Sequence, residues 1–204
     1  LENLKKDFSK VIVLLNNATM FEIGCLEEYD IDAVLFMATP GNYGTYGVGN
    51  ILTGKVSPSG KLSDSYSYDV TDNPAYYTYG TNAYTNASEW SDITAYANKR
   101  IKSLDENNAR YYHYYEGIYV GYRYYETRFI GDDNVYTAAE EAEYQKHVQY
   151  PFGYGLSYAD FSYTAFDVAE AEDGKSFDVT VTVHNDSDTY SGKEAVAVYL
   201  QKPY

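Results

Sequence analysis

Two short apolar runs near the start of the chain constrain its fold more than any other feature. Residues 10–15 and 33–38 are rich in Val, Ile and Leu and read as strands covered on both faces, as in a parallel sheet. The segment between them, residues 19–28, predicts a helix, since Thr19 and Glu22 have the spacing of a capping box. A strand, a helix and a strand within about 30 residues form a right-handed βαβ unit. This part of the chain is therefore predicted to be α/β.

A glycine-rich segment, residues 39–47, follows the second run. It is predicted to be a loop at the carboxyl end of that strand, followed by a short helix over residues 48–53 that Gly54 closes. The loop lacks the glycine spacing of a dinucleotide site and the Gly-Lys-Ser/Thr sequence of a phosphate-binding loop, which argues against nucleotide binding.

Four polar residues are candidates for binding at this edge, because ligands of open α/β sheets lie at the carboxyl ends of the strands. Asn16 and Asn17 end the first strand, and Asn42 and Tyr43 lie in the glycine-rich segment. We expect all four to line one edge and to contact a substrate. Each has a structural alternative, because Asn also caps turns and Tyr43 can instead fill a domain interface.

Charge and composition exclude several classes of protein. Lys and Arg number 15 against 30 Asp and Glu, and the net charge of −15 repels the phosphates of nucleic acids. No apolar run approaches the roughly 20 residues of a membrane-spanning helix, so we expect a soluble protein, cytoplasmic or secreted. Cys25 has no internal disulfide partner. The three histidines are scattered without the spacing of metal ligands, so neither a metal nor a cofactor is predicted.

Tyrosine is unusually frequent, with 27 residues that lie mostly in the middle of the chain. Residues 69–110 are polar and show no sustained hydrophobic period. In this segment the neighbours Glu89 and Trp90 combine a carboxylate with a large ring, which could form a sugar platform or ordinary loop packing. Alternation around residues 118–122 predicts a strand, and residues 138–147 predict a short helix.

The last part of the chain changes character. Residues 161–166, 176–183 and 195–200 alternate with period two, which is typical of an antiparallel sandwich. The predicted fold class is α/β: a partial α/β sandwich with a mostly parallel sheet over residues 1–158, followed by a truncated antiparallel β-sandwich over residues 159–204.

Three long motifs, in order and spacing, resemble the C-terminal region of glycoside hydrolase family 3. They lie at residues 39–62, 115–126 and 150–158. By this resemblance, residues 1–158 are the later part of the family's C-terminal α/β sandwich domain, and residues 159–204 begin its fibronectin type III-like domain. The motif residues expected to be structural are Gly41, Gly54, Pro58, Gly60, Glu116, Gly121, Arg123, Pro151, Phe152, Gly153 and Gly155.

The resemblance implies part of a retaining β-glycosidase of β-glucosidase type, whose mechanism uses two carboxyl groups about 5 to 5.5 Å apart. The nucleophile of the family is an Asp on a (β/α)8 barrel that these residues do not contain. The acid/base Glu lies ahead of Leu1 in many members, and in others in the glycine-rich loop, where this sequence has Tyr43. We therefore expect no catalytic residue in this chain, and no activity from the chain alone.

The expected partners are a carbohydrate such as a β-glucoside and a barrel domain of the same polypeptide. Unpaired sheet edges would also favour self-association. A competing hypothesis is a non-catalytic carbohydrate-binding or interdomain module that uses the tyrosine-rich segment as its platform.

Overall fold

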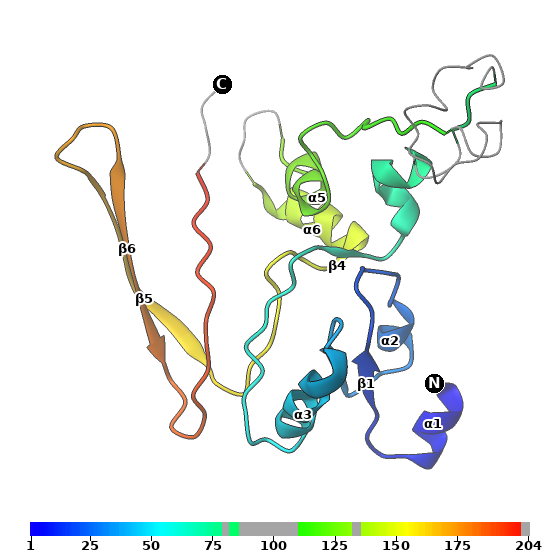
Figure 1. Ribbon diagram of the computed structural model, residues 1–204. Helices are drawn as coiled ribbons and strands as arrows, with labels where there is room; N and C mark the ends of the chain where they lie inside the picture. Colours follow the sequence, from blue (N-terminus) through cyan, green and yellow to red (C-terminus); the bar gives the residue numbers. More distant parts are fainter. Residues whose placement is uncertain (79–81, 86–109, 132–135, 201–204) are drawn as a thin grey trace. The chain divides into compact units, whose positions relative to one another are not determined.

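The computed structural model describes residues 1–78, 82–85, 110–131 and 136–200 (Figure 1). The chain forms two compact units. The first contains Leu1–Met20, Leu26–Ser63 and Pro151–Tyr204, and the second contains Phe21–Cys25 and Asp64–Tyr150. Among the helices of the described residues, none is long and apolar enough to cross a membrane.

A parallel strand pair organises the start of the first unit. Helix α1 (Glu2–Asp7) leads into β1 (Ile12–Leu15), which pairs in parallel with β2 (Ala33–Phe36). The predicted parallel pairing is confirmed. The prediction that both faces are covered is wrong for β1, because Ile12 and Leu14 remain 51% and 41% exposed while the alternate residues are half-buried. In β2, Ala33 and Val34 are exposed and Leu35 and Phe36 are half-buried, so burial there increases toward the carboxyl end of the strand.

In the structure, the helix that was predicted over residues 19–28 is much shorter than expected. Helix α2 covers only Cys25–Glu28. Glu22, expected to complete a capping box, instead accepts a hydrogen bond from the backbone N–H of Val70 at 2.8 Å. Gly24, just before the helix, also disfavours a longer one because glycine loses the most backbone freedom on ordering.

Helix α3 replaces most of the predicted glycine-rich loop. It runs over Gly41–Leu52, so the prediction of a loop over residues 39–47 is wrong. The backbone φ of Pro40, −70°, suits a helix start, and the Gly44 N–H donates to the Pro40 carbonyl at 3.1 Å. The predicted end is confirmed, because Gly54 has a φ of +72° just beyond the helix.

The turn after α3 meets the segment that leads into the C-terminal strands. The Leu62 N–H donates to the Tyr154 carbonyl and the Gly153 N–H to the Leu62 carbonyl, each at 2.8 Å. Lys61 Nζ donates to the Gly155 carbonyl at 2.7 Å. These bonds hold two segments that are distant in sequence side by side within the first unit.

An antiparallel hairpin follows. Strand β5 (Phe161–Glu170) pairs with β6 (Phe177–Asn185), with an irregularity between Tyr163 and Ala165. The strands predicted over residues 161–166 and 176–183 are therefore confirmed. The strand predicted over residues 195–200 is not formed: this segment pairs with no described strand, and alternation alone does not supply the backbone partner that a strand needs.

The second unit is built around buried tyrosines. Strand β3 (Tyr66–Ser67) pairs antiparallel with β4 (Val148–Tyr150), and the short 3-10 helices η1 (Val70–Asp72) and η2 (Pro74–Thr78) follow β3. The core contains Tyr125, which is fully buried, with Tyr144 and Val148, against which Tyr124 and Phe129 pack.

Two helices of this unit test the sequence predictions. Helix α6 (Ala138–His147) has the predicted bounds and begins with a capping box between Thr137 and Glu140. The strand predicted over residues 118–122 is wrong. Gly117 and Gly121 have φ values of +56° and +61°, which break an extended strand, and helix α5 (Tyr122–Arg128) begins there instead.

Candidate functional site

The candidate site lies at the carboxyl ends of β1 and β2. Asn16 and Asn17 follow β1 directly, and a short connection leads from β2 to the start of α3, where Asn42 and Tyr43 lie. Since adjacent parallel strands end at the same edge of a sheet, the fold brings the two pairs of residues to one edge of the first unit.

The side chains at this edge are uncharged and differently engaged. Tyr43 is 84% exposed, and Asn16 and Asn42 are exposed as well. The amide nitrogen of Asn17 donates to the Thr19 carbonyl, whereas its Oδ1 is buried and has no hydrogen-bond partner. Amide and phenol groups donate to and accept from hydroxyl groups, so this edge is suited to a neutral polyhydroxylated ligand.

Helix α3 adds a residue that the sequence prediction missed. Tyr46 lies one turn after Tyr43, on the same helix face, and is 75% exposed. A Cβ added at Gly41 or Gly47 would meet nothing within 4 Å, so the helix is also open at the glycines that flank the two tyrosines. The i, i+3 spacing of the tyrosines is a helical signal, but the loop predicted here hid it.

Charged groups gather at the opposite, amino end of the same strands. The Asp32 carboxylate accepts hydrogen bonds from Lys10 Nζ at 2.7 Å, from the Val11 N–H at 2.9 Å and from Lys5 Nζ at 3.2 Å. These bonds, that of Lys10 foremost, hold the pKa of Asp32 far below its usual value. Asp32 is therefore an ionised structural anchor and is not available as a proton donor.

Motif residues of the first unit lie where two segments of that unit approach each other closely. A Cβ on Gly155 would lie 2.5 Å from the Gly60 carbonyl oxygen, so only glycine fits there. Next to Pro58, the hydroxyls of Ser57 and Ser157 share a hydrogen bond of 2.7 Å. The first and third motifs, residues 39–62 and 150–158, thus meet through a close backbone contact at Gly155 and a hydrogen bond between two serines.

The motif residues of the second unit lie in and beside a turn. Glu116 is buried and its Oε2 has no hydrogen-bond partner. The guanidinium of Arg123 lies over the Tyr122 ring, 5.6 Å from its centroid. A Cβ on Gly121 would lie 3.4 Å from Asp64 Oδ1, an ordinary contact, so its positive φ is the reason for glycine. The predicted platform of Glu89 and Trp90 lies outside the described residues.

In the second unit, carboxylates pair with a histidine and a tyrosine of the same unit. His147 Nδ1 lies 2.5 Å from Asp72 Oδ2, and its Nε2 lies 3.5 Å from Glu143 Oε1. The Tyr144 hydroxyl donates to Glu126 Oε1 at 2.6 Å. Burial first, and then the Glu126 carboxylate, raises the pKa of Tyr144 well above its usual value. No group of three or more potential metal ligands occurs among the residues that the structure describes.

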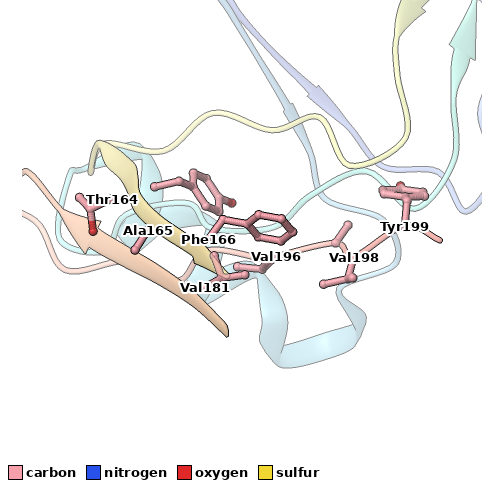
Figure 2. Close-up of a pocket in the computed structure, with 9 residues that line it drawn as sticks. Thr164, Ala165, Phe166, Val181, Val196, Val198 and Tyr199 are labelled. Carbon is pink, nitrogen blue, oxygen red and sulfur yellow. The ribbon is translucent and has the colours of Figure 1, made fainter. Parts of the chain in front are cut away.

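One cavity of about 530 Å³ lies against the C-terminal hairpin, away from the candidate edge (Figure 2). Its lining comes from β5, from Val181 of β6 and from residues 196–199, and Figure 2 shows the Phe166 ring lying beside Val196. The lining contains no carboxylate, so this cavity has no group for glycoside hydrolysis. Its side chains are those of an apolar layer between a hairpin and an extended segment.

Comparison with protein families defines the class of this fold. Residues 1–122 match the glycosyl hydrolase family 3 C-terminal domain. The chain belongs to this family.

Individual relatives agree with that assignment. The chain is 32% identical over 203 residues to a beta-glucosidase of Ruminococcus albus, covering all of this chain and 17% of that protein. It is 30% identical to an exo-alpha-(1->6)-L-arabinopyranosidase of Bifidobacterium longum, covering 98% of this chain and 20% of the relative. The chain thus spans about a fifth of the length of the curated relatives that it matches.

Solved structures resemble the chain at the level of the fold and the sequence. A beta-glucosidase from Paenibacillus barengoltzii is 28% identical with a TM-score of 0.63, over 94% of this chain and 17% of that one. Beta-glucosidase 3B from Thermotoga neapolitana, solved in complex with alpha-D-glucose, has the same identity and TM-score, over 90% of this chain and 20% of that one.

Proposed function

We propose that this chain is part of a retaining β-glycosidase of β-glucosidase type, and that it supplies scaffold and one wall of the substrate site. The observation that carries the proposal is the similarity, along the whole chain, to proteins named beta-glucosidases. In such a mechanism two carboxyl groups act on the glycosidic bond. The nucleophile comes from a (β/α)8 barrel elsewhere in the same polypeptide.

The finer architecture belongs to the same proposal. Residues 1–158 form part of an α/β sandwich domain with a mostly parallel sheet, and residues 159–204 begin a fibronectin type III-like domain. The parallel pairing of β1 and β2 and the antiparallel pairing of β5 and β6 support this division. In this arrangement the apolar lining of the hairpin cavity is interior packing of the fibronectin type III-like domain.

Substrate contacts at the candidate edge come from Asn16, Asn17, Asn42 and Tyr43, with Tyr46 beside them. Their support is the shared position at the carboxyl ends of β1 and β2 and the exposure of the two rings. A sugar or aglycone ring stacks on Tyr43 and Tyr46, and the amides bond its hydroxyl groups. Since all five side chains are uncharged near neutral pH, they bind and orient the substrate and leave proton transfer to other residues.

The test uses the full polypeptide that contains this chain, with release of nitrophenol from aryl glycosides as the readout. The unsubstituted enzyme is expected to be active, and residues 1–204 alone to be inactive. A full polypeptide that hydrolyses no aryl glycoside would refute the hydrolase proposal. Activity of residues 1–204 alone would place a carboxylate pair within them and refute the division of labour.

Two substitutions test the proposed wall. Tyr43→Ala and Tyr46→Ala are each expected to raise KM roughly tenfold, the loss expected for one aromatic stacking contact. Phe177→Ala, on a side chain that is 67% exposed and does not line the hairpin cavity, is the matched control and should leave KM unchanged. Equal KM values for all three variants would remove Tyr43 and Tyr46 from the substrate site.

The sugar is tested separately, because relatives of similar identity have names with different sugars. A panel of nitrophenyl β-glucoside, β-xyloside and α-L-arabinopyranoside is compared by kcat/KM. We expect the β-glucoside to be preferred. A preference for the α-L-arabinopyranoside would leave the family intact and change the substrate.

A further inference from the structure

A second group of exposed rings lies in the other unit, on a segment that the proposed function does not use. Residues 111–115 read Tyr-Tyr-His-Tyr-Tyr. Their start is fixed against a neighbouring segment, because Ala83 and Arg110 form an antiparallel bridge and the Tyr111 N–H donates to the Asn82 carbonyl at 3.1 Å. We name Tyr84 together with residues 111–115 the tyrosine ribbon; residues 111–115 lie in the green trace before α5 in Figure 1.

The rings of the ribbon contact one another in pairs, each pair tilted, before any ligand binds. The centroids of Tyr84 and Tyr111 are 4.9 Å apart, and those of Tyr112 and Tyr114 are 4.8 Å apart. The His113 and Tyr115 rings are 4.1 Å apart, since the Tyr115 N–H donates to the His113 carbonyl at 3.0 Å and folds the backbone between them. Side chains held in this way lose little rotational freedom on binding, which favours affinity.

The same rings remain open to solvent. Tyr114 and Tyr115 are 69% and 65% exposed, and Tyr111 and Tyr112 are 42% and 43% exposed. In contrast, Glu116, the acidic residue that follows the ribbon, is 8% exposed. The ribbon therefore presents ring faces and hydroxyls, with no carboxylate among its residues.

This surface fits a neutral polysaccharide better than other ligands. A pyranose ring has an apolar face of C–H groups, which packs on an aromatic ring, and a rim of hydroxyl groups, which the tyrosine hydroxyls can bond. The net charge of −15 disfavours polyanions. A stable protein interface uses roughly 20–30 residues on each side, far more than this narrow ribbon offers.

We propose that the tyrosine ribbon binds a neutral polysaccharide of pyranose units, such as a glucan, without hydrolysing it. Tyr114 and Tyr115, the most exposed rings, make the principal contacts, and their ring neighbours Tyr112 and His113 hold them in place. The binding requires no catalytic residue, so it does not depend on the proposed hydrolase function.

The experiment measures retardation of the full polypeptide in native gels that contain hydroxyethylcellulose, a soluble neutral glucan. Carboxymethylcellulose, an anionic derivative, serves as the comparison. Retardation by the neutral polymer is expected. Tyr114→Ala and Tyr115→Ala are each expected to weaken it roughly fivefold to tenfold, as for the loss of one stacked ring.

Two further variants separate ring stacking from loss of structure. Tyr114→Phe keeps the ring and should retain most of the binding. Phe177→Ala, at 67% exposure against 69% for Tyr114, is the matched control and should bind as the unsubstituted protein does. Thermal unfolding of each variant checks that the fold is intact.

Other results of the gel and self-association experiments would overturn the proposal. No retardation of the unsubstituted protein, or equal retardation of all variants, would mean that the ribbon does not bind glucan. Equal or stronger binding to carboxymethylcellulose would reject the neutral ligand. If the protein self-associates and Tyr114→Ala abolishes that association without changing glucan binding, the ribbon is a contact between copies. A protein that binds glucan but hydrolyses no glycoside would support the ribbon and refute only the proposed function.

Discussion

Substitution of Gly155 by alanine is the sharpest test of how the first unit holds together. A Cβ there would lie 2.5 Å from the Gly60 carbonyl oxygen and 3.3 Å from the Lys61 Cα, which are both backbone atoms that cannot rotate away. The two segments would have to separate, against the bonds from Leu62 to Tyr154 and from Lys61 to Gly155, at 2.8 and 2.7 Å. Overpacking typically costs 1–3 kcal/mol, and a weakened hydrogen bond about 1 kcal/mol more, so we expect a loss of about 2–4 kcal/mol.

The assay is urea unfolding of the purified protein, followed by far-ultraviolet circular dichroism. A loss of this size lowers the midpoint by about 1 M or more for an m-value of roughly 2 kcal/mol/M. Gly60→Ala is the matched control: a Cβ on Gly60 would meet nothing within 4 Å, so its midpoint should stay close to that of the unsubstituted protein. If Gly155→Ala unfolds at the same urea concentration as Gly60→Ala, the close approach does not stabilise the unit and the reasoning is refuted.

Three further substitutions test single interactions. Thr137→Ala removes the capping box with Glu140 and should cost about 1 kcal/mol of unfolding free energy, measured by urea unfolding; no change would mean that the box does not stabilise α6. The lowered pKa of Asp32 gives stability that is present above its unfolded pKa near 4 and is lost as pH falls through the folded pKa. In thermal unfolding, the stability of Asp32→Asn should therefore depend less on pH in the acid range. An unchanged slope of stability against pH in that range would contradict this. Burial and Glu126 raise the pKa of Tyr144, which gives stability that is present below about pH 10 and is lost as pH rises toward the folded pKa. In thermal unfolding, Tyr144→Phe should therefore lose less stability above pH 10 than the unsubstituted protein. A stability profile that still falls as steeply would exclude Tyr144 as the cause.

Elements with a strong local pattern could be predicted from the sequence. The apolar runs around β1 and β2 required a parallel pair, and the structure pairs Ile12 with Ala33 and Leu15 with Phe36. The bounds predicted for α6 hold because a capping box fixes its start at Thr137. In these cases a few neighbouring residues determine the element.

Glycine explains two of the predictions that were wrong, the loop over residues 39–47 and the strand over residues 118–122. Propensity alone makes a glycine-rich stretch a poor helix, yet α3 begins at Gly41. Alternation around residues 118–122 resembled a strand, but positive φ angles at Gly117 and Gly121 turn the chain instead. Sequence patterns do not reveal which conformation a glycine takes, because glycine admits nearly all of them.

The candidate site was predictable only in part, for a related reason. Asn16, Asn17, Asn42 and Tyr43 could be placed at one edge from the βαβ pattern alone, because topology fixes where strands end. Tyr46 required the helical period of α3, which a loop prediction cannot supply.

The two ends of the parallel pair differ in a way that limits what this chain contributes to catalysis. At the amino end, Asp32 is ionised and held by Lys10 and Lys5. At the carboxyl end, Asn42 and Tyr43 present groups that are uncharged near neutral pH. A retaining glycosidase needs one carboxylate as nucleophile and one carboxyl group as acid/base close to the sugar. The candidate edge offers neither, so we propose that it contributes binding of the sugar to the enzyme, and substitutions there should change KM more than kcat.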